Sequence, residues 1–329
     1  MFGRQVRLYV GKFDRGNDSS EFFDLSNLNF SFEITRSVEW YENSAVITIY
    51  NPSANTINRL MTEGNAVRIM AGYEDEGNLA NVFIGQIAFI VPKRNRKNVT
   101  VEITCITDRG NFYQLSRLHC AFSFSKGMTI RNCLKELCDY ANIALRAGTF
   151  PFLDEGLQHP FRVSGSFRFV VKEFTEYVLR PLNQCKIYLD NNEMIVFGKD
   201  NSMALEQIVL THNSGLIECC PVRDETKNKV NFGDDPAYFM LSGTNQDVEP
   251  KKSPAVNIDR PLIVKGKAMM NPSIIPNSFA IIDSYDGSAY DAYLGVRGRF
   301  LITECKYIGG NFDNEFYVEF TAKEAPYKK

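Results

Sequence analysis

The stretch SAVITIYNPSANTINRL, residues 44–60, changes its periodicity halfway along. Up to Tyr50 the side chains alternate with a period of two and include several β-branched residues, which predicts a strand with one buried face. Pro52 has no N–H to give to a sheet ladder, so the strand is expected to end there. A strand that leads directly into another element is therefore the first feature that the sequence defines.

A short helix is predicted directly after this proline. Ser53 is the expected N-cap, because its hydroxyl oxygen can accept a hydrogen bond from an N–H of the first turn. Ile57, Leu60 and Met61 share one helical face, and Gly64 is the expected C-terminal stop. A helix of this length is marginal alone, so we expect it to pack on the sheet that precedes it.

Strand periodicity continues through the first hundred residues. Residues 81–91 and 99–107 are typical of the two arms of a hairpin with one solvated face, joined by the polar turn 92–98. Many short strands with turns between them and one brief helix indicate a small β-barrel or β-sandwich.

The pattern changes near residue 110. Residues 126–145 and 169–185 have helical periodicity, residues 186–198 are typical of a hairpin, and strands return after about residue 205. The fold class expected is mainly β with an α+β insert. Its domains are a first β-barrel at 1–110, the insert at 111–204 and a second β-barrel at 205–329.

Two distant strands share a short pattern in the same register. Residues 99–105 (VTVEITC) and 316–322 (FYVEFTA) each form the second arm of a predicted hairpin that closes a β region. Both contain V-E-[I/F]-T. The matching position adds weight to four matching residues and predicts a duplicated β domain interrupted by the insert.

Composition and motifs exclude several function classes. A net charge of −2 argues against a basic surface that coats nucleic acid. No apolar run reaches the length that spans a bilayer, and the N-terminus has no signal-peptide core, so no membrane anchor is expected. The three histidines lie outside any triad or zinc motif, and the eight cysteines contain no C-x-x-C. We therefore expect no catalytic residue, no metal ligand and no cofactor.

The order of several short motifs resembles that of bacteriophage tail baseplate hub proteins. The motifs are LSNL (25–28), IYNPS (49–53), AGY (71–73), VFIGQI (82–87), SGLIECCP (214–221) and MNPSIIPNS (270–278). The match covers most of the chain. Pro52 departs from the more usual apolar residue, and Cys219-Cys220 departs from the expected smaller residues.

The resemblance implies two tail-tube-like β-barrels in each chain and assembly as a homotrimer. The trimer would form a pseudo-sixfold ring between the hexameric tail tube and a trimeric spike or tip. The implied partners are the tail tube protein, the spike or tip protein, the tape-measure protein and other baseplate proteins. The implied location is the virion, after assembly in the host cytoplasm. DNA would pass through the ring without specific binding.

Candidate contact residues follow from the strand and helix patterns. Thr100, Glu102 and Thr104 on one barrel, with Glu319 and Thr321 on the other, are candidates to line the channel, because a lining that transmits DNA should not be basic. The alternative is that these residues face solvent or another subunit. The predicted helix offers a second surface, where Asn55, Asn58 and Arg59 are candidates for contacts between subunits.

Three other functions compete with a phage tail hub. The first is the hub component of a type VI-like secretion spike, which would have the same architecture. The second is a tail-associated cell-wall hydrolase, whose catalytic domain would have to be the insert of about ninety residues. The third is a carbohydrate- or protein-binding β-sandwich that forms no ring.

Overall fold

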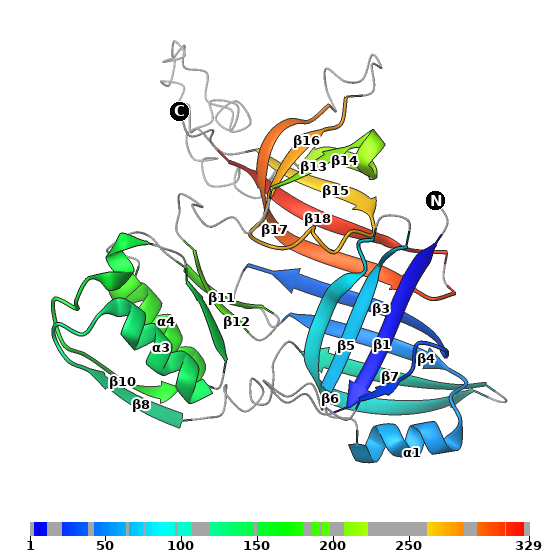
Figure 1. Ribbon diagram of the computed structural model, residues 1–329, viewed down its shortest axis with the longest axis horizontal. Coiled ribbons are helices and arrows are strands. Elements are labelled where there is room, and N and C mark those ends of the chain that lie inside the picture. Colours follow the sequence, from blue (N-terminus) through cyan, green and yellow to red (C-terminus); the bar gives the residue numbers. More distant parts are fainter. Residues whose placement is uncertain are drawn as a thin grey trace, which may run out of the picture.

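The computed structural model (Figure 1) describes fifteen segments of the chain. They are residues 3–11, 22–38, 43–63, 66–74, 77–95, 98–106, 119–141, 143–147, 150–179, 186–190, 193–197, 207–222, 262–285, 295–312 and 314–325. The long polar stretches 223–261 lie outside them. Among the described residues, no helix is both long and apolar enough to cross a membrane.

The residues that the structure describes up to Ile106, called the first half below, form seven strands and one helix. They are β1 (Arg4–Gly11), β2 (Phe22–Asp24), β3 (Asn29–Ser37), β4 (Ser44–Tyr50), α1 (Ala54–Glu63), β5 (Ala66–Tyr73), β6 (Ala80–Asn95) and β7 (Asn98–Ile106). These strands pair in the order β3-β4-β7-β6-β5-β1-β2.

The described residues from Gln207 onward, called the second half below, form six strands of the same sheet. They are β13 (Gln207–Thr211), β14 (Leu216–Val222), β15 (Ile263–Met269), β16 (Phe279–Asp283), β17 (Arg297–Gly310) and β18 (Tyr317–Glu324), with a short 3-10 helix η3 (His212–Ser214) before β14. Their order is β14-β15-β18-β17-β16-β13.

The two halves repeat one arrangement of strands. The order β3-β4-β7-β6-β5-β1 corresponds strand for strand to β14-β15-β18-β17-β16-β13, although β1 pairs antiparallel and β13 pairs parallel. Each half also has a bulge at the matching place. The extra residue is Ala88 in β6, opposite the step from Thr104 to Cys105, and Thr303 in β17, opposite the step from Thr321 to Ala322. The duplication predicted from V-E-[I/F]-T therefore extends to strand order and irregularities.

The halves are joined through their backbones. β17 pairs antiparallel with β3 over seven residue pairs, from Glu304 opposite Ser37 to Gly310 opposite Ser31, so both halves belong to one 13-stranded sheet (Figure 1). One hydrophobic cluster contains buried side chains from both halves. The turn after β17 adds to the joint, since the Asn311 side chain accepts a hydrogen bond from Phe30 N at 3.0 Å and donates one to Ser26 O at 3.1 Å.

The insert has its own hydrophobic core. It contains β8 (His119–Phe124), α3 (Ile130–Ala141), β9 (Ala144–Ala147), η1 (Pro151–Asp154), β10 (Phe161–Ser166), α4 (Phe167–Phe174), η2 (Thr175–Leu179), β11 (Lys186–Asp190) and β12 (Glu193–Phe197). The predicted hairpin is confirmed as β11–β12, and Thr129 caps α3 by accepting a hydrogen bond from Asn132 N. Tyr140 on α3 is 47% exposed, and its ring covers Phe122 at the edge of the core.

The strand-to-helix corner of the opening stretch is confirmed. Ser53 Oγ accepts a hydrogen bond from Thr56 N at 3.1 Å, and α1 begins at Ala54. Asn51 turns the chain with a positive φ of 49°, and its Oδ1 accepts a hydrogen bond from Val99 N at 3.0 Å, so a side chain continues the ladder past the end of β4. Leu60 is fully buried, but Met61 is 55% exposed, so the prediction that Met61 packs on the barrel is wrong.

Candidate functional site

The five residues predicted to line a channel lie on one continuous face of the sheet. Residues directly opposite each other in paired strands point to the same face. From β18 across to β7 the residues that follow this rule are Glu319, Lys306, Thr35, Ser44 and Ile106. The period of two then adds the remaining candidates, Thr321, Thr104, Glu102 and Thr100. We call this surface the outward face, because its opposite side packs into the shared core.

The second half carries alternating charges on the outward face. Glu218, Lys267, Glu319 and Lys306 lie opposite one another on the successive strands β14, β15, β18 and β17. Lys306 Nζ lies 2.9 Å from Glu33 Oε1 on β3, which extends the row into the first half. A hydrogen bond from Lys306 to Glu33 raises the pKa of this lysine, and Glu319 and Glu315 act in the same direction. Each lysine in this row therefore has a carboxylate beside it.

The first half carries apolar side chains on the same face, which the sequence analysis missed. Glu102 is held by Lys93, whose Nζ lies 2.7 Å from Glu102 Oε2. Four other exposed neighbours, on both sides of β7, are hydrophobic: Val46, Tyr50, Phe89 and Val91. The alternation in FIVPK (89–93) places Phe89 and Val91 on this outward face. The sequence analysis predicts only that one face of this hairpin is solvated, and does not predict that its exposed residues are apolar. In the first half, the polar candidates of β7 are therefore flanked by apolar side chains.

The outer face of α1 is only partly available for contacts. Asn55 and Asn58 are exposed. The guanidinium of Arg59 lies over the ring of Phe23 in β2, 4.4 Å from its centroid, so Arg59 contacts its own chain. The exposed Met61 adds an apolar group to this surface.

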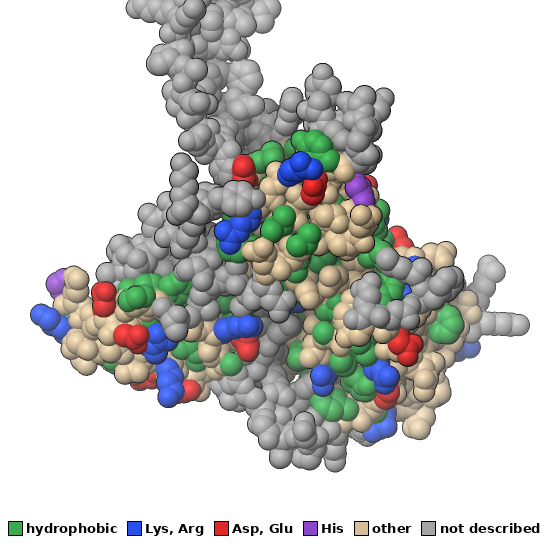
Figure 2. Space-filling model, turned by 45° about the horizontal axis from the view of Figure 1, so that its top comes forward, with side chains coloured by type: hydrophobic (Ala, Val, Ile, Leu, Met, Phe, Trp, Pro, Cys, Tyr) green, Lys and Arg blue, Asp and Glu red, His purple; other side chains and the backbone are tan. Residues whose placement is uncertain are grey.

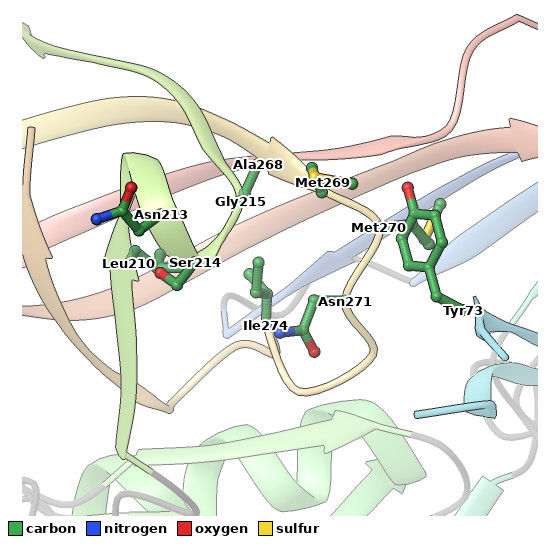
Figure 3. Close-up of a pocket in the computed structure, with 10 residues that line it drawn as sticks. All are labelled: Tyr73, Leu210, Asn213, Ser214, Gly215, Ala268, Met269, Met270, Asn271 and Ile274. Atoms are coloured by element: carbon green, nitrogen blue, oxygen red, sulfur yellow. The ribbon is translucent and has the colours of Figure 1, made fainter. Parts of the chain in front are cut away.

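A small pocket lies between the two halves, with a volume of about 250 Å³ (Figure 3). Its lining residues are Tyr73, Leu210, Asn213, Ser214, Gly215, Ala268, Met269, Met270, Asn271 and Ile274. Tyr73 and Met270 lie together at one end, and Asn213 and Ser214 lie at the other (Figure 3). None of the ten is a histidine, cysteine, lysine, arginine or acid, so the lining offers no imidazole, amine or carboxylate to activate the hydroxyls of Ser214 and Tyr73.

The three histidines are exposed and lie in different elements. His119 begins β8, His159 precedes β10, and His212 begins η3, where its Nε2 lies 3.2 Å from Ser284 O. Within the described segments, no group of three or more His, Cys, Asp or Glu side chains is arranged to hold a metal ion. The outward face of the sheet is therefore the main candidate functional surface.

Two comparisons of the sequence found no match. No protein-family model matches it, and no curated protein matches it. Solved structures do match. A tail protein from Neisseria meningitidis MC58 has a TM-score of 0.59 at 11% identity, covering 98% of this chain and 97% of that chain. The chain has a phage tail-hub fold.

Two further structures support this tail-hub fold. The 43 kDa tail protein of prophage MuSo2 from Shewanella oneidensis has a TM-score of 0.56 at 10% identity, with 99% of both chains covered. An E. coli component of the type VI secretion system has a TM-score of 0.53 at 10% identity, covering 99% of this chain and 77% of that chain. The predicted fold class, two tube-like barrels around an α+β insert, is confirmed.

Proposed function

We propose that the chain is the structural hub of a phage tail. It would form a homotrimeric ring that adapts the hexameric tail tube to a trimeric spike or tip and lets DNA pass. The observation that carries this proposal is the repeated strand order in the two halves of one chain. Three chains with two equivalent halves each present six similar units, so one ring can meet sixfold and threefold partners.

The parts of the chain take separate roles in this proposal. The barrels at 1–110 and 205–329 build the ring, and the insert at 111–204 breaks the sixfold pattern. The partners are the tail tube, the spike or tip, the tape-measure protein and other baseplate proteins, with Asn55 and Asn58 available on α1. The protein belongs to the virion after assembly in the host cytoplasm, and no catalytic step is assigned to it.

The experiment that tests this function is assembly with the tube. The mass of the purified full chain is measured in solution, and the chain is then imaged with and without the tail tube protein of the same virion. We expect rings with threefold symmetry at the end of short tubes. A chain that stays monomeric and never joins the tube protein would contradict the proposal.

The charge row on the outward face supports passage of DNA without binding. A free lysine in a lumen would hold phosphates, and each phosphate contact strengthens DNA binding in a salt-dependent way. Lys267 lies opposite Glu319, and Lys306 lies beside both Glu319 and Glu33. These carboxylates keep the local charge near zero while the face stays polar.

Removing two of these carboxylates should convert the face into a DNA-binding surface. We expect the double variant Glu33→Gln, Glu319→Gln to bind DNA about 10-fold more tightly than the parent at 50 mM salt, with the gain lost at high salt. Fluorescence anisotropy with labelled duplex DNA measures this. Glu136→Gln together with Glu173→Gln on the insert helices removes the same charge elsewhere and should leave binding unchanged. Equal gains in both variants would show that net charge alone is responsible.

A second candidate function is the hub of a type VI-like secretion spike. The match to an E. coli component of that system, with a TM-score of 0.53, favours it. Both candidates use the same ring. They differ in the tube that the ring caps, so the hub is mixed with a phage tail tube protein and with a type VI tube protein. Capture by the type VI tube protein alone would favour the second candidate.

A further inference from the structure

The pocket between the two halves (Figure 3) has an apolar floor and a polar mouth. The floor consists of residues that are at most 3% exposed: Tyr73, Leu210, Ala268, Met270 and Ile274. The mouth consists of exposed or half-buried polar residues: Asn213, Ser214 and Asn271. An apolar depth beneath amide and hydroxyl groups suits an apolar group that enters from a polar carrier.

Contacts outside the pocket hold its floor in place. The ring of Tyr73 packs edge-on against that of Phe316, with 5.4 Å between their centroids. The carbonyl oxygen of Ile274 accepts a hydrogen bond from Tyr307 Oη, and Ile274 N donates one to Asn271 O at 3.1 Å. These contacts preorganise the floor, so a ligand would not have to order it on binding.

The mouth is held by hydrogen bonds of its own. Ser214 N donates to Thr211 Oγ1 at 3.2 Å, and Thr211 N donates to Ser214 Oγ at 2.8 Å. Gly215 then turns the chain with a φ of 95°, a left-handed conformation that glycine adopts without strain. Its carbonyl oxygen accepts a hydrogen bond from Met269 N at 2.8 Å. The two segments on either side of the mouth are therefore tied together.

The volume of the pocket limits the size of its ligand. At about 250 Å³ it is smaller than the roughly 300–1,000 Å³ of pockets that hold drug-sized molecules. An apolar cavity of about 150 Å³ already holds benzene. The pocket therefore has room for a single aromatic ring with its attachment, such as the side chain of Phe or Trp.

The chemistry of the lining favours a neutral ligand. Its described residues include no Lys, Arg, His, Asp or Glu, and an ionic group buried without a partner is costly. Met269 and Met270 both line the pocket, and thioether sulfur makes favourable contacts with aromatic rings. A neutral aromatic ring is therefore the group that this lining fits best.

We propose that the pocket receives one aromatic side chain, a Phe or a Trp, of a partner protein. The backbone of the partner would stay at the mouth. There Asn271 Oδ1 accepts a hydrogen bond from Ser273 N at 2.9 Å, which leaves Asn271 Nδ2 to donate to a carbonyl oxygen of the partner. Aromatic side chains buried in such pockets dominate the affinity of many protein interfaces. The inference goes beyond the proposed hub function and does not depend on a ring.

An occupant of the pocket would contact both halves of the sheet. Tyr73 belongs to the first half, and the other lining residues belong to the second. A ligand that binds only the folded chain stabilises it by mass action. Binding of the partner would therefore also strengthen the association between the two halves.

The experiment uses the full-length chain with ¹³C-labelled methionine methyl groups. The probes are indole and capped tripeptides with Trp, Phe or Ala between two glycines. We expect indole and the Trp and Phe peptides to shift the methyl signals of Met269 and Met270 saturably at millimolar concentrations, and the Ala peptide to shift neither. Met61, 55% exposed on α1, is the control for adsorption to the surface and should not respond. Benzoate and benzylamine carry a charge on the same ring and should not bind.

Two variants place the probe in the pocket. Ala268→Leu adds side-chain volume to the floor and should weaken binding of the Trp peptide at least about 10-fold. Ile274→Val removes one methylene from the floor, disturbs the fold little, and should tighten binding of the Trp peptide about 3-fold relative to the Phe peptide. Circular dichroism checks that both variants are folded, and Ile274→Val keeps the test decisive if Ala268→Leu is not.

Each other outcome would overturn the inference. A response of Met61 equal to that of Met270 would mean adsorption to the surface, and binding of benzoate or benzylamine would contradict a neutral site. Binding of indole without the peptides would mean that the pocket takes a free small molecule. No saturable shift with any probe, or unchanged peptide selectivity in Ile274→Val, would show that the pocket is not an anchor site. None of these results depends on ring assembly, which tests the hub function separately.

Discussion

Tyr307→Phe is expected to lower the free energy of unfolding by about 2–3 kcal/mol, because it removes a hydroxyl that forms hydrogen bonds with two buried groups. Tyr307 is fully buried in β17, where its Oη donates to the carbonyl oxygen of Ile274. The same oxygen accepts a hydrogen bond from Arg36 Nη1 at 3.2 Å, and this guanidinium also donates to Val82 O at 3.4 Å. The cluster connects both halves of the sheet at β3, β6 and β17.

The variant leaves polar atoms of the cluster without this partner. Arg36 is only 2% exposed, so its charge is poorly solvated when a hydrogen bond is lost. Urea unfolding followed by fluorescence measures the change in midpoint. Tyr317→Phe is the matched control. Tyr317 Oη donates a hydrogen bond to the exposed carboxylate of Glu315 at 3.2 Å, so a change within about 0.5 kcal/mol is expected. Equal losses in the two variants would contradict the role given to the buried cluster.

Gly85→Ala should destabilise the chain by about 3 kcal/mol, through forced overpacking at a bend of β6. A Cβ at this position would lie 2.4 Å from the carbonyl oxygen of Ile106 and 2.5 Å from the ring of Phe83. Gly85 lies where β6 leaves β5 and begins to pair with β7. Backbone approaches this close at a barrel corner are sites where only glycine fits.

The backbone oxygen cannot move away without disturbing the β6–β7 ladder, and Phe83 is fully buried. Thermal unfolding followed by circular dichroism measures the effect. The neighbouring Gln86→Ala is the control, because Gln86 is only half-buried, and it should change stability by less than about 1 kcal/mol. A Gly85→Ala chain as stable as the parent would mean that Ile106 or Phe83 relaxes without cost.

Local patterns were sufficient to predict most of the elements. The period of two in residues 44–50 identified the buried face of β4, and Pro52-Ser53 located the start of α1. The shared V-E-[I/F]-T register indicated the duplication, since equivalent strands keep equivalent alternation. These features depend on neighbouring residues, so a single sequence contains them.

Pairing between distant strands was beyond local patterns. No pattern in residues 29–37 indicates that their second partner is β17, because β17 begins only at Arg297, far along the chain. Alternation identifies two faces of a strand, but not which neighbours surround each face. For that reason the apolar Phe89 and Val91 around Glu102 were missed, as was the contact of Arg59 with Phe23, while the contact of Arg59 with another subunit stays a prediction.

The β3–β17 joint has a consequence for synthesis of the chain. β3 ends at Ser37 and β17 begins at Arg297, so the ribosome adds most of the protein between the two edges that must meet. At roughly 5–20 residues per second, the edge of β3 waits tens of seconds for its own partner. During that time a β17 from another newly made chain is an equally good match. High local concentrations of nascent chains would therefore favour swapped products, and dispersed translation would favour correctly closed ones.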